Sequence, residues 1–390
     1  MDNFSKVTNR VGFNCKKWDA RESMFGDGDI IPMWIADMDF RVPDEVVNAI
    51  TARAAHGLFG YTGMPDSYLA SVMAWMKRHH QWEVQKEWIC HSPGVVTALS
   101  LLIDAYTKPG DKVIIQSPVY YPFARTIKTA GRTVLDNPLR VENGRYMMDL
   151  ENLKAQLDDS VKMIFLCSPH NPVGRVWQRE ELMALAELCL AHNILIVSDE
   201  VHADLIYAGS HHTCLPTLSR EIEQCTILCT GASKTFNLAG LKTSSIIIPN
   251  EALRAQFNAV VNNYNVGSGN IFGLVATEAA YRHGDTWLSE LNEYLQQNLA
   301  YLLDFMQKKL PQISVVRPEG TYLVWMDFSG LGMDDQALNN FCLRKAKIAL
   351  DPGFEFGTGG SGFMRINIAC PRQTLEKALQ QLLEAVVSAI

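Results

Sequence analysis

A chain of 390 residues, of which 47% are hydrophobic and 20% charged, has the composition of an ordinary globular protein. Its length exceeds what one hydrophobic core usually serves, so we expect two domains. The formal net charge of −7 and the scattered Lys and Arg residues argue against direct binding to nucleic acid. No stretch has the layout of a signal peptide or the apolar length of a membrane span, so we expect a cytoplasmic protein without membrane contact.

The sequence contains nine cysteines, and several lie inside apolar runs such as 164–167 and 227–229. An odd number distributed in this way argues against a framework of disulfides. The neighbouring residues His211, His212 and Cys214 follow no recognised zinc-binding spacing. We therefore expect reduced thiols and no metal site.

Short apolar runs alternate with amphipathic stretches through the middle of the chain, which predicts an α/β fold with a mostly parallel sheet flanked by helices. From about residue 285 a long helical stretch and short strands indicate a smaller α+β domain. We predict a large domain over 44–285 and a small domain built from 1–43 and 286–390. In chain order, we expect a helix at 95–107, strands at 112–116 and 162–167, a helix at 179–192, strands at 194–198, 226–230 and 243–248, helices at 252–262 and 287–309, strands at 313–317 and 322–327, a helix at 335–346, a strand at 363–368 and a helix at 374–390.

Three polar residues follow or close successive predicted strands: Asn171, Asp199 and Lys234. The carboxyl ends of parallel strands are where such sheets bind ligands. A lysine amine that can form a Schiff base, an amide for a phenolic oxygen and a carboxylate for a pyridinium nitrogen together describe a pyridoxal 5′-phosphate site. The buried carboxylate keeps the ring nitrogen protonated, so that the ring withdraws electrons. A single lysine after a strand is more often a solvated surface residue, so the prediction depends on all three.

Two further segments provide groups for such a cofactor. Glycine at the start of the helix at 95–107 lets the N–H groups of Gly94, Val95 and Val96 approach a phosphate, although the motif alone also fits a plain helix start. In the loop after the strand at 112–116, we expect Tyr120 to stack on the cofactor ring and Tyr121 to contact the substrate and take part in catalysis. Paired tyrosines in a loop can also serve only for packing.

Other polar residues in apolar surroundings are candidates for the site. His202 could bond near the phenolic oxygen, whereas a lone histidine is more often structural. Arg365 lies inside an apolar strand and needs an anionic partner; an amino acid α-carboxylate matches its guanidinium fork, and a structural ion pair is the alternative. Asp37 and Asp39 would lie on one side of an extended segment, and we expect a structural role for them. The backbone at Ala36 would then lie close to the substrate.

Several sequence motifs between about residues 30 and 372 resemble those of one group of enzymes. The chain is similar to the MalY/PatB-type cystathionine β-lyases, which include the cystalysins, among the fold-type I pyridoxal phosphate enzymes of aminotransferase class I/II. The motifs are Ile35-Ala-Asp-Met-Asp-Phe40, Phe59-Gly-Tyr61, Ser168-Pro-His-Asn-Pro-Val-Gly174, Ser198-Asp-Glu-Val-His202, Ser233-Lys-Thr-Phe-Asn-Leu-Ala-Gly240 and Phe363-Met-Arg-Ile-Asn367.

The resemblance implies a homodimer with two sites at its interface, in which Tyr61 reaches the phosphate and substrate of the neighbouring subunit. It also implies phosphate contacts from Ser233 and Lys242. This sequence departs from the wider superfamily, because aminotransferases commonly carry tyrosine in place of His202, arginine in place of Lys242 and serine in place of Gly231.

The same resemblance implies a carbon–sulfur β-lyase of amino-acid metabolism and methionine biosynthesis. Its small-molecule substrate would be a sulfur amino acid: L-cystathionine, or a related cysteine S-conjugate, would give a thiol such as homocysteine, pyruvate and ammonia. Lys234 would remove the α-proton, and a thiol with a pKa near roughly 8.5 is a good leaving group. The alternatives are an aminotransferase, which shares the steps up to the carbanion, and an enzyme with a second role as a protein-binding regulator.

Overall fold

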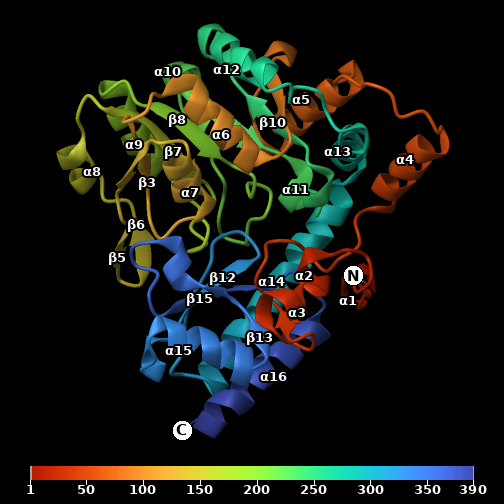
Figure 1. The fold of residues 1–390 in the computed structure, drawn as a ribbon, viewed down its shortest axis with the longest axis vertical. Helices are drawn as coiled ribbons and strands as arrows, with labels where there is room; N and C mark the ends of the chain where they lie inside the picture. The colour runs from red at the N-terminus through yellow and green to blue at the C-terminus, as the bar shows by residue number, and fades with distance from the viewer. Residues whose placement is uncertain (1, 390) are drawn as a thin grey trace.

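The computed structural model describes residues 2–389, and a seven-stranded sheet lies at its centre (Figure 1). Its strands are β2 (Ile89–Ser92), β3 (Lys112–Ile115), β4 (Thr133–Asp136), β7 (Val161–Cys167), β8 (Leu195–Asp199), β9 (Thr226–Thr230) and β10 (Ser244–Ile247). They lie in the order β2-β10-β9-β8-β7-β3-β4. The pairs from β4 to β9 are parallel, whereas β10 is antiparallel to both of its neighbours.

Helices cover both faces of this sheet. Successive residues of β7 point to opposite faces, so Met163 and Phe165 join one apolar cluster while Ile164 and Leu166 join another. Burial of both faces explains why the strand sequences are almost continuously apolar. The helices in this part of the chain are α4 (Asp44–Ala55), α5 (Asp66–His80), α6 (Val95–Tyr106), α7 (Pro122–Thr129), α8 (Leu150–Gln156), α9 (Arg179–Ala191), α10 (Arg220–Gln224), α11 (Ala232–Thr235), α12 (Glu251–Asn263) and α13 (Ile271–His283).

The last third of the chain forms a second, antiparallel sheet, drawn in blue below the first in Figure 1. Its order is β11 (Ser314–Val316), β12 (Leu323–Asp327), β15 (Phe363–Asn367) and β14 (Asp351–Pro352). The accompanying helices are α14 (Asp285–Lys309), α15 (Asp335–Asn340) and α16 (Arg372–Ala389).

The N-terminal segment pairs with this last third of the chain. β1 (Ile31–Pro32) is parallel to β13 (Ile348–Ala349). Ahead of it lie three short helices, α1 (Asp2–Ser5), α2 (Lys16–Asp19) and α3 (Arg21–Phe25). The exact division into domains at residues 43 and 285 stays a prediction.

The α/β fold class is confirmed, and most predicted elements differ from the observed ones only at their ends. One prediction needs correction, and several elements, among them β2 and β4, were not predicted. The helix expected at 335–346 ends as an α-helix at Asn340 and continues as a π-helix, Phe341–Lys345, whose wider turn breaks the helical period. Strand β2 was not predicted, because four residues containing His91 and Ser92 carry little apolar signal. The predicted end of the last helix, Ile390, lies outside the described residues.

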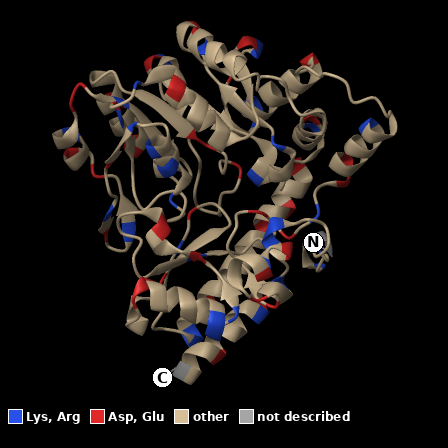
Figure 2. Ribbon diagram, viewed as in Figure 1, with Lys and Arg blue, Asp and Glu red and all other residues tan. Residues whose placement is uncertain are grey.

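Among the residues that the structure describes, no helix is both long and apolar enough to cross a membrane. The nine cysteines are free thiols. Figure 2 shows basic and acidic residues interspersed over the helices and loops on the face in view.

Candidate active site

The ends of β7, β8 and β9 bring three predicted residues together. Cys167, at the end of β7, pairs in register with Asp199, the last residue of β8. Asn171 follows β7 after a short loop, and α11, directly after β9, carries Lys234. All three line one cavity of about 210 Å³. The parallel register therefore places an amide, a carboxylate and an amine at one edge of the sheet.

Most of the predicted site residues line this cavity, and a few other residues do so as well. The predicted residues in its wall are Ala36, Gly94, Val95, Val96, Tyr120, Asn171, Asp199, His202, Ser233, Lys234 and Lys242. Of the described residues predicted for the site, three lie outside this lining: Tyr61, Tyr121 and Arg365. The residues that the sequence analysis missed include Thr97, Cys167, Val201, Thr243 and Ser244.

The ammonium group of Lys234 is enclosed by protein at the cavity wall. Its Nζ donates a hydrogen bond of 2.7 Å to the carbonyl oxygen of Ala36. Burial, and then the positive charge of Arg365, lower the pKa of Lys234 to about 8, against the opposing charges of Asp37 and Asp199. An amine with this pKa is partly uncharged near neutral pH, so it can act as a nucleophile or a base.

Burial shifts the pKa values of Asp199 and His202 toward the uncharged form of each side chain. Burial raises the pKa of the Asp199 carboxyl to about 7, although it accepts a hydrogen bond from the Val201 N–H. A protonated ring nitrogen beside it would supply the positive charge that favours the carboxylate. Burial, followed by the charges of Lys234 and Arg365, lowers the pKa of His202 well below its usual value. The buried Nδ1 of this neutral imidazole has no hydrogen-bond partner among the described residues, so the ring retains hydrogen-bonding capacity for a ligand.

The amino end of α6 opens onto the same cavity. Gly94 precedes the helix with φ +126°, a backbone conformation that favours glycine. The N–H groups of the first helical turn have no partners within a helix, so they can bind an anion. Ser233, Lys242 and Ser244 add two hydroxyls and an ammonium group to the cavity wall. The Ser244 hydroxyl is buried without a hydrogen-bond partner in the described part of the chain.

Packing explains one departure from the wider superfamily. A Cβ atom on Gly231 would lie 3.3 Å from both the Cα of Ser244 and the carbonyl oxygen of Thr243. A serine here would therefore crowd the backbone at the start of β10. Ser244, which begins β10, provides a hydroxyl in the same cavity wall instead. The sequence signal for it was a pair of serines at the start of an otherwise apolar strand.

Arg365 lies behind the cavity in a set of polar contacts. It forms a buried ion pair with Asp351, and it donates hydrogen bonds of 2.9 Å to the Asn171 side-chain oxygen and 3.0 Å to the Trp34 carbonyl oxygen. The structure thus contains the ion pair that the sequence left as an alternative. The buried Nε of Arg365 has no hydrogen-bond partner among residues 2–389.

The tyrosines divide into different environments. Tyr120 lines the cavity, but Tyr121 packs edge-on against Phe356, with their ring centroids 5.6 Å apart. Tyr61 is fully exposed on the loop between α4 and α5, which runs along the outer edge of the molecule in Figure 1. The roles predicted for Tyr61 and Tyr121 stay predictions.

Comparison with known proteins identifies the family. The model of the family "Aminotransferase class I and II" matches residues 29–382. The chain belongs to this family. Within the aminotransferase class I and II family, it is 44% identical over 381 residues to the cystathionine β-lyase PatB of Bacillus subtilis, with 97% of this chain and 98% of that protein covered.

Two solved structures of relatives superpose closely. Cystalysin from Treponema denticola, which contains pyridoxal 5′-phosphate, matches with a TM-score of 0.96 and 36% identity over 99% of this chain and 98% of its own. The pyridoxal phosphate-bound C–S lyase from Staphylococcus hominis matches with a TM-score of 0.93 and 32% identity over 99% and 98%. The resemblance drawn from the sequence motifs is confirmed.

Proposed function

We propose that this protein is a pyridoxal phosphate-dependent carbon–sulfur β-lyase that cleaves L-cystathionine and related cysteine S-conjugates. The observation that carries this proposal is the convergence of Lys234, Asp199 and Asn171 on one cavity. The 44% identity to a cystathionine β-lyase over nearly the whole chain supports the choice of reaction.

The residues present fit the cofactor. Lys234 would hold its aldehyde carbon, and the Asp199 carboxylate would pair with its ring nitrogen. Asn171 and His202 would bond near the phenolic oxygen, and Tyr120 would stack on the ring. The phosphate would be held by Gly94, Val95, Val96, Ser233, Lys242 and Ser244. When bound, the cofactor supplies an electron-withdrawing ring that makes the α-hydrogen of an amino acid acidic.

The chain's own residues then carry the proton and orient the substrate. With the cofactor bound, the uncharged Nζ of Lys234 would take the proton from the α-carbon. Arg365, which contacts Asn171, would hold the α-carboxylate together with it, and the Ala36 backbone in the cavity wall would lie against the substrate. The β-carbon loses its sulfur as a thiolate, and addition of one water gives a thiol, pyruvate and ammonia. The role of Tyr121 in contacting the substrate is part of this proposal.

The proposal includes a homodimer. Leu58, Phe59 and Tyr61 are exposed on the same loop, by 69%, 58% and 111%. Apolar groups gathered on a protruding loop are typical of a surface that a partner covers. In the homodimer Tyr61 would reach the phosphate of the neighbouring subunit. The cytoplasmic location expected from the sequence stays a prediction.

The test is to incubate the purified enzyme with L-cystathionine and measure pyruvate, free thiol and substrate-derived keto acid. Equal amounts of pyruvate and homocysteine are expected. A keto acid that retains the sulfur, without pyruvate, would instead establish aminotransfer. The Lys234→Ala variant is expected to lose the turnover and the visible absorbance of the bound cofactor.

A further inference from the structure

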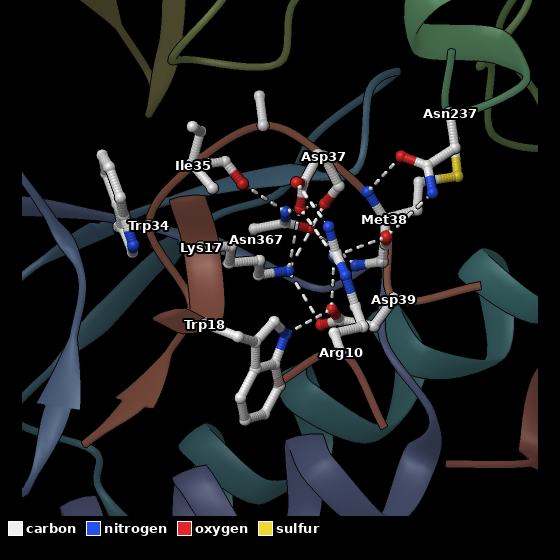
Figure 3. Close-up of polar contacts among 12 residues, drawn as sticks. Arg10, Lys17, Trp18, Trp34, Ile35, Asp37, Met38, Asp39, Asn237 and Asn367 are labelled. Atoms are coloured by element: carbon white, nitrogen blue, oxygen red, sulfur yellow. Dashed lines mark hydrogen bonds and ion pairs between the residues drawn. The ribbon is translucent and has the colours of Figure 1, made fainter. Parts of the chain in front are cut away.

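A cluster of charged side chains connects the N-terminal segment to Asp37 and Asp39, which follow the residue that contacts Lys234 (Figure 3). We call Arg10, Lys17, Asp37 and Asp39 the ion cluster. Arg10 bridges both carboxylates, at 2.9 Å from Asp37 and 2.7 Å from Asp39. Lys17 lies 2.8 Å from Asp39 and 3.4 Å from Asp37. The indole N–H of Trp18 donates to Asp39 at 2.8 Å.

Two members of the ion cluster are buried and two, Arg10 and Asp37, are each 21% exposed, and the proposed reaction does not use these side chains. Lys17 is only 1% exposed and Asp39 is 6% exposed. Burial alone would raise the pKa of the Asp39 carboxyl, but the charges of Lys17 and Arg10 outweigh it, and this pKa is lowered. Two positive and two negative groups balance, so the cluster is stable only when complete.

Two asparagine side chains hold the backbone of residues 35–38 from the other side. Asn367 donates to the carbonyl oxygens of Ile35 and Asp37, at 2.7 and 2.6 Å. Asn237 accepts from the Met38 N–H and donates to the Met38 carbonyl oxygen, both at 2.9 Å. Figure 3 shows these amides and the ion cluster gathered around the short segment from Ile35 to Asp39.

The ion cluster and the two asparagines together fix the direction in which the Ala36 carbonyl group points. The Ala36 oxygen accepts from Lys234 Nζ at 2.7 Å and from the Tyr322 hydroxyl at 3.1 Å. The next residue, Asp37, places its carboxylate in the ion cluster. A movement of this carboxylate would therefore move the carbonyl that holds the lysine.

Resting on the proposed function, in which Lys234 carries the proton, we propose that the ion cluster is a positioning device for this lysine. Arg10 and Lys17 hold the Asp37–Asp39 segment so that the Ala36 carbonyl meets Nζ. Arg10 and Lys17 neutralise the negative charge of Asp37 only in part, so Asp37 also stabilises a positive charge at Nζ. Arg10 and Lys17 are thus positioning residues, contributed by a segment about 200 residues away from Lys234 in the sequence.

The charged and titratable groups facing Lys234 come from several elements. Asp37 and Asp199 favour its protonated form, and Arg365 opposes it. His202 also interacts with Lys234 but is held neutral by burial. Tyr322 shares the Ala36 carbonyl, and burial raises its pKa far above neutral, so it stays uncharged. Only Asp37 among these groups is paired with Arg10, so a change at Arg10 acts through Asp37.

The test measures the pH at which the visible absorbance of the cofactor-loaded enzyme changes. Asp37→Asn removes a negative charge and is expected to lower this midpoint, whereas Arg10→Gln removes a positive charge and is expected to raise it, each by roughly half a pH unit. The double variant should keep the midpoint of Asp37→Asn, because Arg10 acts on Lys234 through Asp37. Arg10→Lys keeps the positive charge, so its midpoint should lie much closer to the wild-type value than that of Arg10→Gln.

Matched controls come from an exposed ion pair on α14, where Lys308 and Asp304 lie 2.7 Å apart. Lys308→Gln and Asp304→Asn change charge equally but should leave the midpoint unchanged. A cluster that serves only folding would leave both midpoints unchanged in variants that fold, and this result would overturn the inference. Should Arg10→Gln not fold, Asp37→Asn and Arg10→Lys still test the cluster, and an unchanged midpoint in Asp37→Asn would overturn the inference.

A second readout separates this inference from the proposed function. Acetylation of the Lys234 amine after removal of the cofactor, followed by mass spectrometry as a function of pH, reports the same opposite shifts. These shifts are expected whether the enzyme eliminates thiols or transfers amino groups. Opposite shifts without pyruvate formation would support the positioning role and reject the lyase. Pyruvate formation without these shifts would support the lyase and reject the positioning role.

Discussion

At the scale of single residues, the environment of Asp199 determines how the site works. Its carboxyl group is buried, and the proposed cofactor depends on its negative charge. We expect Asp199→Asn, which keeps the side-chain volume, to lower kcat by a factor on the order of 10²–10³. Steady-state kinetics measure this loss, and the visible absorbance checks that the cofactor is retained. Unchanged kcat in a cofactor-loaded variant would contradict the assignment.

The same carboxyl group predicts a pH effect on stability. Because burial raises its folded-state pKa to about 7, its contribution to stability is present below its unfolded pKa of about 4 and is lost as the pH rises through 7. Without cofactor, the wild-type protein should therefore lose stability relative to Asp199→Asn between these pH values. Urea denaturation at several pH values measures the difference. A constant difference across this range would show that Asp199 does not titrate as its burial predicts.

At the scale of elements, close packing between α13 and the chain around β10 fixes part of the cavity wall. A Cβ atom on Gly273 in α13 would lie 1.9 Å from the Thr243 hydroxyl oxygen and 2.7 Å from the Leu241 carbonyl oxygen. Alanine is preferred over glycine in a helix by about 1 kcal/mol, but such overpacking costs about 1–3 kcal/mol or more. The cost of overpacking should exceed the gain in helix preference, because the Leu241 backbone carbonyl cannot move away without shifting the chain.

We therefore expect Gly273→Ala to lower the free energy of unfolding and to weaken cofactor retention, since Thr243 lines the cavity. Gly240→Ala is the matched control: no atom of the described chain lies within 4 Å of its Cβ position, and its φ lies outside the range that favours glycine. Urea midpoints and cofactor dissociation rates compare the two variants. Equal stability in both would show that α13 moves to accept the methyl group.

At the scale of the whole molecule, the exposed Tyr61 loop predicts that each site is shared between two subunits. Lys234→Ala and Tyr61→Ala variants should both be inactive or weak alone. Unfolded and refolded together, they should regain about a quarter of the wild-type activity, because half of the dimers are mixed and each mixed dimer has one intact site. No gain on mixing would place Tyr61 outside the partner's site, and light scattering would establish the dimer independently.

Local patterns in the sequence were enough to predict the α/β class, most strands of the central sheet and the residues at their carboxyl ends. Asn171, Asp199 and Lys234 could be found because side-chain alternation and strand boundaries depend mainly on neighbouring residues. Parallel topology then brings the carboxyl ends of adjacent strands together, whatever the distance along the chain.

The tertiary structure decided which distant groups meet. Arg365 needed an anion by sequence alone, but only the pairing of β14 with β15 shows that Asp351 supplies it. Asp37 and Asp39 were predicted to be structural, but their partners Arg10 and Lys17 lie in a separate segment and carry no periodic signal. Hydrophobic periodicity indicates which face of a helix or strand is buried. The partner of a buried charge depends instead on which distant helices, strands and loops pack against it.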